Sequence, residues 1–196
     1  ILSSFQEQVP DAPVVRPEDL GKFRTLAQII AHVAGQSAAG TGSQGFDGEG
    51  NHRLQAFLYH PNDLGFDLAG TAFLLDWNNH RVRKVGADQK LVTVIGTDEP
   101  GDGDPAKDDL KAGAPGTNVK LNHPTDVFFP AIDTPIAKKG DLLLAAWHNH
   151  RFRTWNPVSA LVTVTCGMAP GFGGDGLPAS KSTNFNQPSK LTQDAA

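Results

Sequence analysis

The sequence is poor in cysteine, in charged residues and in long apolar runs. Its 196 residues include one cysteine, and charged residues make up 19% of them, against about 25% in an average soluble domain. The single Cys166 excludes a disulfide framework and a zinc site built from several thiolates. No apolar run approaches the roughly 18 residues that a membrane-spanning helix needs, so no membrane span is expected.

The sequence also lacks an excess of positive charge. The formal net charge is -4 at pH 7, so the chain has no global basic surface for nucleic acid, and none is expected as a partner. Turn-forming residues are abundant instead, with 21 glycines and 14 prolines. This composition favours short strands joined by tight loops over long helices.

Part of the sequence is repeated further along the chain. Residues 76–83 (DWNNHRVR) return at 146–153 (AWHNHRFR), and residues 91–94 (LVTV) return unchanged at 161–164. A glycine-rich acidic loop follows each apolar run, and a proline then opens the next one. The loops lie at 45–48, 101–104 and 171–176, and the prolines are Pro61, Pro124 and Pro188. Recurrence in a fixed order is the signature of a repeat protein.

Each repeat has the pattern of short β-strands. In the first, strands are predicted at 63–67, 71–75, 80–85 and 91–95, because these runs are rich in Val, Leu and Phe and are bounded by turn residues. Four short antiparallel strands per repeat are typical of a β-propeller blade. We therefore predict an all-β chain with two complete blades, near 61–95 and 124–165, and a partial blade at each end.

These motifs resemble those of bacterial NHL-repeat proteins. The resemblance rests on residues 79–83 (NHRVR), their return at 149–153 (NHRFR), and the loop 171–179 (GFGGDGLPA). It implies a β-propeller, commonly of six blades, although Ala146 replaces an aspartate that is usual in the family.

On this basis, residues 29–196 are expected to form a propeller segment and residues 1–28 an extended arm or linker. Two blades cannot close a ring, which has about four to eight. Missing blades or other protein chains are therefore expected to complete it.

Several polar residues lie where the second strand of a repeat turns into the third. Asp and Asn side chains bond nearby backbone amides, so we interpret these residues as structural turn formers: Asp76, Asn79, His80, Asn149 and His150. Trp77 and Trp147 at the same hairpins are interpreted mainly as packing against the neighbouring blade. A stacking surface that binds sugars or partner side chains is the alternative, and both residues are kept as binding candidates.

The third strands carry most of the clustered cations. Because charged residues on strands usually face water, these are interpreted as solvated strand faces: Arg81, Arg83, Lys84, Arg151 and Arg153. Arg81 and Arg151 are kept as candidate ligand-binding residues. Some NHL propellers bind RNA through a positive face, but five cations in an acidic protein are too few for phosphate neutralisation.

The histidines before the prolines are interpreted mainly as loop residues that close a turn, and a metal site is the alternative. His60 and His123 precede the prolines of two innermost strands, and a related six-bladed lyase that cleaves peptidyl-hydroxyglycine holds zinc with channel histidines. The third repeat has Gln187 in that place, whereas a catalytic zinc normally keeps three protein ligands. His148 and His150 form a second candidate pair, since residues two apart on a strand face the same side.

No cofactor is expected, and calcium at the glycine–aspartate loops or zinc at the histidines remain the alternatives. Because no catalytic set is recognisable, the main prediction is a non-enzymatic scaffold that binds protein partners or ligands within a larger propeller or assembly. The alternative is a fragment of a metal-dependent lyase or hydrolase. The resemblance, together with Ile1 in place of an initiator Met, favours an extracytoplasmic bacterial protein, periplasmic or secreted.

Overall fold

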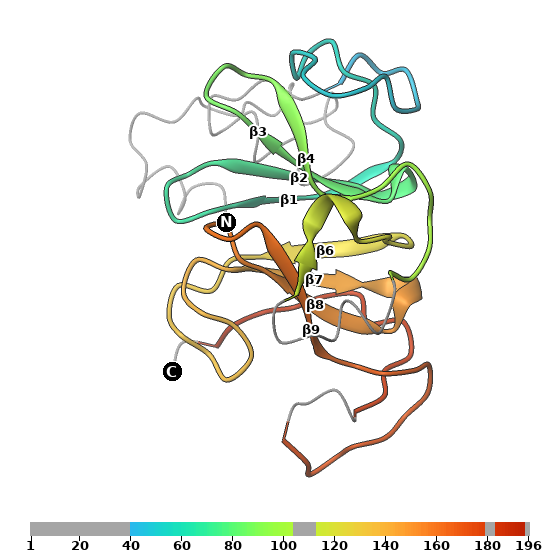
Figure 1. Cartoon of the computed structure of the whole chain (residues 1–196), viewed down its shortest axis with the longest axis vertical. Helices are drawn as coiled ribbons and strands as arrows, with labels where there is room; N and C mark the ends of the chain where they lie inside the picture. Colours follow the sequence, from blue (N-terminus) through green and yellow to red (C-terminus); the bar gives the residue numbers. More distant parts are fainter. Residues whose placement is uncertain (1–39, 104–112, 179–182, 195–196) are drawn as a thin grey trace, which may run out of the picture.

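The computed structural model describes residues 40–103, 113–178 and 183–194. Within these ranges the chain forms two antiparallel sheets and three short 3-10 turns (Figure 1). The all-β prediction is therefore confirmed for the described residues. Among them, no helix has the length and apolar character needed to cross a membrane. The arm predicted at 1–28 and the first part of the predicted propeller segment, residues 29–39, lie outside the described residues.

The first sheet is an up-and-down meander in which each strand pairs with its neighbour in sequence. Its order is β1 (Pro61–Phe66), β2 (Ala72–Asp76), β3 (Arg81–Val85) and β4 (Leu91–Gly96). The predicted strands match these bounds to within a few residues. The Val, Leu and Phe content of each short run and the turn residues at its ends were sufficient to locate them.

The second sheet repeats the meander and adds an edge strand. It contains β5 (Ala114–Pro115), β6 (Pro124–Phe128), β7 (Leu142–Ala146), β8 (Arg151–Trp155) and β9 (Leu161–Cys166), in the order β5-β9-β8-β7-β6. The two-residue β5 was not predicted, since Ala and Pro are poor strand formers and only the edge position accommodates the proline.

The two sheets stack with β1 of one against β6 of the other (Figure 1). Apolar side chains from both sheets form one buried cluster, in which the ring centroids of Phe73 and Trp155 lie 5.9 Å apart. Gly65 permits the close approach of the sheets, because a Cβ there would lie 3.0 Å from Val127. Burial of these groups is the main force that holds the sheets together.

A hydrogen bond from a backbone amide to an aspartate carboxylate also links the first strand of each repeat to the next repeat. The Val127 amide in β6 donates to the Asp63 carboxylate of β1 over 2.8 Å. The Leu191 amide donates in the same way to Asp126 of β6, also over 2.8 Å. Residues near 191 therefore occupy, beside the second sheet, the position that β6 occupies beside the first.

Candidate functional site

The β2–β3 and β7–β8 hairpins have the same conformation. In each, a 3-10 turn, η1 (Trp77–Asn79) or η3 (Trp147–Asn149), ends at a histidine in the left-handed region. His80 has φ 54° and His150 has φ 58°. Each histidine amide donates to the carbonyl of the turn's tryptophan over 3.1 Å. His80 therefore lies in the turn, one residue before the strand in which we predicted it.

These turn histidines bind the following repeat. The residues before Pro124 and Pro188 are also left-handed, with φ 52° at His123 and 54° at Gln187. The His123 amide donates to Nδ1 of His80 over 3.2 Å, and the Gln187 amide donates to Nδ1 of His150 over 3.2 Å. Each turn histidine therefore accepts a hydrogen bond from the residue that precedes the next proline.

Rings from both repeats gather beside these turns. The indole of Trp77 lies 4.3 Å from His123 and 6.2 Å from Trp147, measured between ring centroids, and Trp147 stacks on His148 at 3.9 Å. All these rings are partly exposed. We call the group the aromatic–imidazole cluster, which comprises His60, Trp77, His80, His123, Trp147 and His148.

Hydrogen bonds determine which ring nitrogens of the cluster carry protons. The Asn78 amide oxygen only accepts, so Nε2 of His123, 3.0 Å away, donates to it. A neutral His123 then has a lone pair on Nδ1, which accepts from Nδ1 of His148 over 3.0 Å. Protonation of His123 would add a donor at Nδ1, and His148 would then have to carry its proton on Nε2 to accept this bond. Accordingly, burial, followed by the nearby His148, lowers the pKa of His123.

The cluster makes stability sensitive to acid. Burial, and then the positive charges of His123, Arg81 and His148, lowers the pKa of His80 to about 4. An unfolded histidine titrates near 6.5, so between these values the unfolded chain binds more protons. The contribution of His80 is fully present above about pH 6.5 and is lost as the pH falls toward 4. After allowance for partial exposure of the ring, we expect a loss of about 1–2 kcal/mol.

The comparison of His80→Asn with the unaltered chain isolates this contribution. Asparagine tolerates the left-handed region and can accept the His123 amide, but it does not titrate. Urea unfolding at pH 7 and at pH 4.5 should show a smaller acid loss in this variant. His52→Asn, outside the cluster, should lose stability as the unaltered chain does. An equal loss in His80→Asn would contradict the assignment.

Of the candidate metal ligands, the structure brings together His123 and His148, one from each candidate pair, with their Nδ1 atoms 3.0 Å apart. The rings of His60 and His123 lie on the indole of Trp77, at centroid distances of 6.3 and 4.3 Å. His148 and His150 lie in a turn and not on a strand, so the same-side argument for two residues apart does not apply, and they contact different partners. Across the described ranges, no three His, Cys, Asp or Glu side chains are grouped as a metal site.

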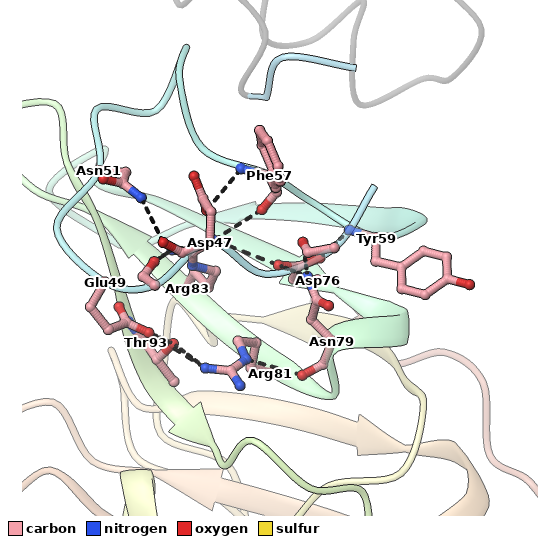
Figure 2. Close-up of polar contacts among 12 residues, drawn as sticks. Asp47, Glu49, Asn51, Phe57, Tyr59, Asp76, Asn79, Arg81, Arg83 and Thr93 are labelled. Atoms are coloured by element: carbon pink, nitrogen blue, oxygen red, sulfur yellow. Dashed lines mark hydrogen bonds and ion pairs between the residues drawn. The ribbon is translucent and has the colours of Figure 1, made fainter. Parts of the chain in front are cut away.

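The interpretation of the arginines as solvated strand residues is wrong. Arg83 and Arg153 have 0% exposure, and Arg81 and Arg151 are also buried. In the first sheet, Asp76 and Glu49 lie around the pair (Figure 2). Asp98 also pairs with Arg81, over 2.9 Å. Arg81 and Arg151, kept above as ligand-binding candidates, therefore make internal ion pairs.

A phenylalanine completes the arginine environment in the first sheet. The guanidinium carbon of Arg81 lies 3.7 Å from the centroid of the Phe46 ring, and that of Arg83 lies 5.1 Å from it. Cation–π contacts of this kind shield a buried guanidinium from water at little cost. The loop at 45–48, which the sequence identified only as a turn, is therefore part of the arginine site.

The second sheet has arginines at the equivalent positions, but a different residue supplies their carboxylate partner. Asp76 is buried, lies 3.7 Å from Arg83 and accepts the Tyr59 amide over 2.8 Å. Its counterpart in the second sheet is Ala146, so other residues there pair with the arginines and accept the backbone amide. Asp102 pairs with Arg151 and Arg153 at 2.6 and 2.8 Å.

In the second sheet, an asparagine accepts the backbone amide that Asp76 accepts in the first. There Asn149 Oδ1 accepts the Asn122 amide over 3.0 Å. Asp102 therefore has a structural role as the counter-ion of two buried arginines. Asp104, in the glycine–aspartate loop considered for calcium, lies outside the described residues.

Comparisons with known proteins give a fold similarity and no family. No protein-family model matches the chain, and no curated protein matches its sequence. A provisionally assigned phosphatase of Bacteroides thetaiotaomicron is similar in structure with a TM-score of 0.53 at 17% identity, over 72% of this chain and 31% of that one. This similarity shows a shared fold.

Two further solved structures are auxiliary nutrient binding proteins from Bacteroides thetaiotaomicron and Bacteroides ovatus. They match with TM-scores of 0.48 and 0.47 at 18% and 20% identity, each over 64% of this chain and 30% of theirs. The chain thus spans less than a third of the length of these solved structures.

Proposed function

We propose that the chain is a non-enzymatic binding scaffold, formed by consecutive blades of an NHL-type β-propeller segment, that binds partner proteins at the aromatic–imidazole cluster. One observation carries the proposal. Two tryptophans and several imidazoles from separate repeats meet, partly exposed, at adjacent turns. Trp is enriched among the residues that dominate binding energy at protein interfaces.

The repeated junction supports the blade arrangement. Both sheets are meanders, and β1 lies beside β6. The same two bonds, from a backbone amide to the turn histidine and from a backbone amide to the first-strand aspartate, recur after each sheet. A repeated contact of this kind relates successive units by one constant rotation, as in a propeller.

The chemistry of the cluster favours a peptide segment of a partner over a charged ligand. The lowered pKa values of His80 and His123 keep these imidazoles neutral at pH 7. Flat indole faces beside neutral rings suit apolar or aromatic side chains, and the ring nitrogens can bond a peptide group. Cations and phosphates would find no opposite charge within the cluster itself.

Replacement of both indoles should remove this binding. We expect Trp77→Leu/Trp147→Leu, which retains apolar packing but lacks the flat faces, to bind cognate peptides at least tenfold more weakly, as for truncated interface tryptophans. The probe is an immobilised array of 15-residue peptides that is incubated with the full chain. Affinities of the positive peptides are then measured by fluorescence titration.

A surface variant outside the cluster provides the control. Val158 is 94% exposed in the β8–β9 turn, so Val158→Ala should bind as the unaltered chain does. Thermal unfolding verifies that each variant folds. Equal peptide binding by the double leucine variant would overturn the proposal, and so would an array without positive peptides. Binding to a glycan array in place of peptides would assign the cluster to a different class of ligand.

A further inference from the structure

Two imidazoles of the second repeat face each other across a short distance. His123 lies directly before β6 and His148 lies in η3, and their Nδ1 atoms are 3.0 Å apart. A backbone bond joins the two segments beside these side chains, since the His148 amide donates to the Asn122 carbonyl over 3.2 Å. The backbone arrangement therefore holds the two histidines close together.

Neighbouring side chains fix the orientation of both rings. The indole of Trp147 stacks on His148, with 3.9 Å between the centroids and 20° between the planes. The ring of His123 is held at its other nitrogen, because Nε2 donates to the Asn78 amide oxygen over 3.0 Å. Histidines that bind metals commonly donate their second ring nitrogen to an oxygen in this way. His123 therefore already has the tautomer in which Nδ1 carries a lone pair.

A metal ion can replace the hydrogen bond between the rings without a change of protein charge. The proton that His148 donates from Nδ1 can move to its Nε2, and this half-exposed ring can then bond water there. Two lone pairs then lie side by side, both rings stay neutral, and no proton leaves the protein. A neutral imidazole binds a transition metal through its lone pair, so the site needs no negative charge.

The distance between the two nitrogens selects the class of metal. Imidazole nitrogens bind zinc at about 2.0–2.1 Å. At this bond length, two ligands at a right angle lie about 2.9 Å apart, and two ligands at the tetrahedral angle lie about 3.3 Å apart. The 3.0 Å between His123 and His148 fits the right angle. Square-planar and tetragonal sites are typical of Cu²⁺ and Ni²⁺, and Cu²⁺ binds more tightly.

The first repeat has a different residue in place of one ligand. Asn78 occupies in the first hairpin the position that His148 occupies in the second, and the Asn78 amide likewise donates to a carbonyl, that of Tyr59, over 2.9 Å. His60, which precedes Pro61, thus lies opposite an asparagine position. In the two sheets the imidazole pair occurs once, and the first repeat shows that asparagine is compatible with the same turn.

We propose that His123 and His148 bind one Cu²⁺ ion through their Nδ1 atoms, at adjacent positions of a tetragonal site whose other positions solvent can fill. This site goes beyond the proposed peptide binding and does not depend on it. Trp147 and Trp77 flank the two ligands, at centroid distances of 3.9 Å from His148 and 4.3 Å from His123. Because Cu²⁺ quenches the emission of nearby indoles, tryptophan fluorescence reports its binding.

Titration of the full chain with copper(II) chloride at neutral pH tests the site. We expect saturable quenching that ends at one equivalent, and an axial Cu²⁺ electron paramagnetic resonance spectrum with nitrogen hyperfine splitting. His148→Asn, which gives the second hairpin the residue of the first, should bind Cu²⁺ at least tenfold more weakly, since even outer-shell changes cost about 10- to 100-fold. Asn78→Ala leaves both ligands in place but releases Nε2 of His123, so it should weaken binding by about tenfold or more.

His150→Asn is the matched control in the same turn. Asparagine tolerates the left-handed region at this position and can accept the Gln187 amide, so this variant should bind Cu²⁺ as the unaltered chain does. Thermal unfolding verifies that each variant folds. Unchanged affinity in His148→Asn, or an equal loss in His150→Asn, would overturn the proposal. Absence of saturable quenching, or equal competition by Zn²⁺ at the same concentration, would overturn it as well.

Discussion

Replacement of Asp76 by alanine should lower the free energy of unfolding by about 3–5 kcal/mol, the cost of leaving a buried charge without its partner. Asp76 and Arg83 both have 0% exposure, and the carboxylate also accepts the Tyr59 amide and Nδ2 of Asn79. Burial raises the pKa of Asp76 in spite of these contacts, so desolvation is a large opposing cost. The loss therefore comes mainly from the stranded guanidinium and the unpaired amide. Urea unfolding followed by tryptophan fluorescence measures it.

The second sheet provides a rescue for this variant. There an alanine stands in place of Asp76, and Asp102, the counterpart of Phe46, neutralises the arginines. Phe46→Asp/Asp76→Ala should therefore recover roughly half of the lost stability, since an ion pair returns to the guanidinium while the Tyr59 bond does not. Asp88→Ala, at an exposed turn, should change stability by about 0.5 kcal/mol or less. A double variant no more stable than Asp76→Ala would contradict this explanation.

Gly96→Ala should destabilise the chain by about 3–4 kcal/mol, through a backbone clash. Gly96, at the end of β4, has φ 121°, and a Cβ there would lie 2.6 Å from the His80 carbonyl oxygen. Backbone atoms cannot move aside as a flexible side chain can. The β3–β4 pairing or the His80 turn must therefore shift. Thermal and urea unfolding would measure the change.

A second glycine variant distinguishes the steric clash at Gly96 from the cost of placing alanine in the left-handed region. Gly70 has φ 80°, but a Cβ there would meet nothing within 4 Å. Gly70→Ala should consequently cost only the roughly 1–2 kcal/mol of a left-handed alanine. If the two variants lost equal stability, steric contact with the His80 carbonyl would not be the cause.

The strands could be predicted because the residues that determine them lie within or directly beside each strand. Each run of five or six residues, such as β4 and β9, is rich in apolar residues, and turn residues mark its ends. The burial of Arg83 was not predictable in this way. A strand with alternating cations resembles a solvated strand, and what covers Arg83 lies far away in sequence, at Phe46 and Gly48.

The aromatic–imidazole cluster contains residues that the sequence singled out, but their arrangement was not predicted. Trp77 and Trp147 were interpreted as packing against a neighbouring blade, with a stacking surface as the alternative. The pairing of His123 with His148 was missed, because it depends on a left-handed histidine and on the packing of one sheet against the next. The presence of a histidine at the same position in each turn could have predicted the contact between repeats, because a polar residue that recurs in every repeat indicates a recurring contact.

The hydrogen bonds that recur at both junctions between repeats run in one direction along the chain. At His80, Asp63, His150 and Asp126, an earlier repeat supplies the side-chain acceptor and a later one supplies the backbone donor. A repeat that emerges later from the ribosome therefore meets acceptors already held in place by the previous one. Assembly during synthesis should accordingly proceed from the N-terminal repeat onward. Damage to an early repeat should then impair every repeat made after it.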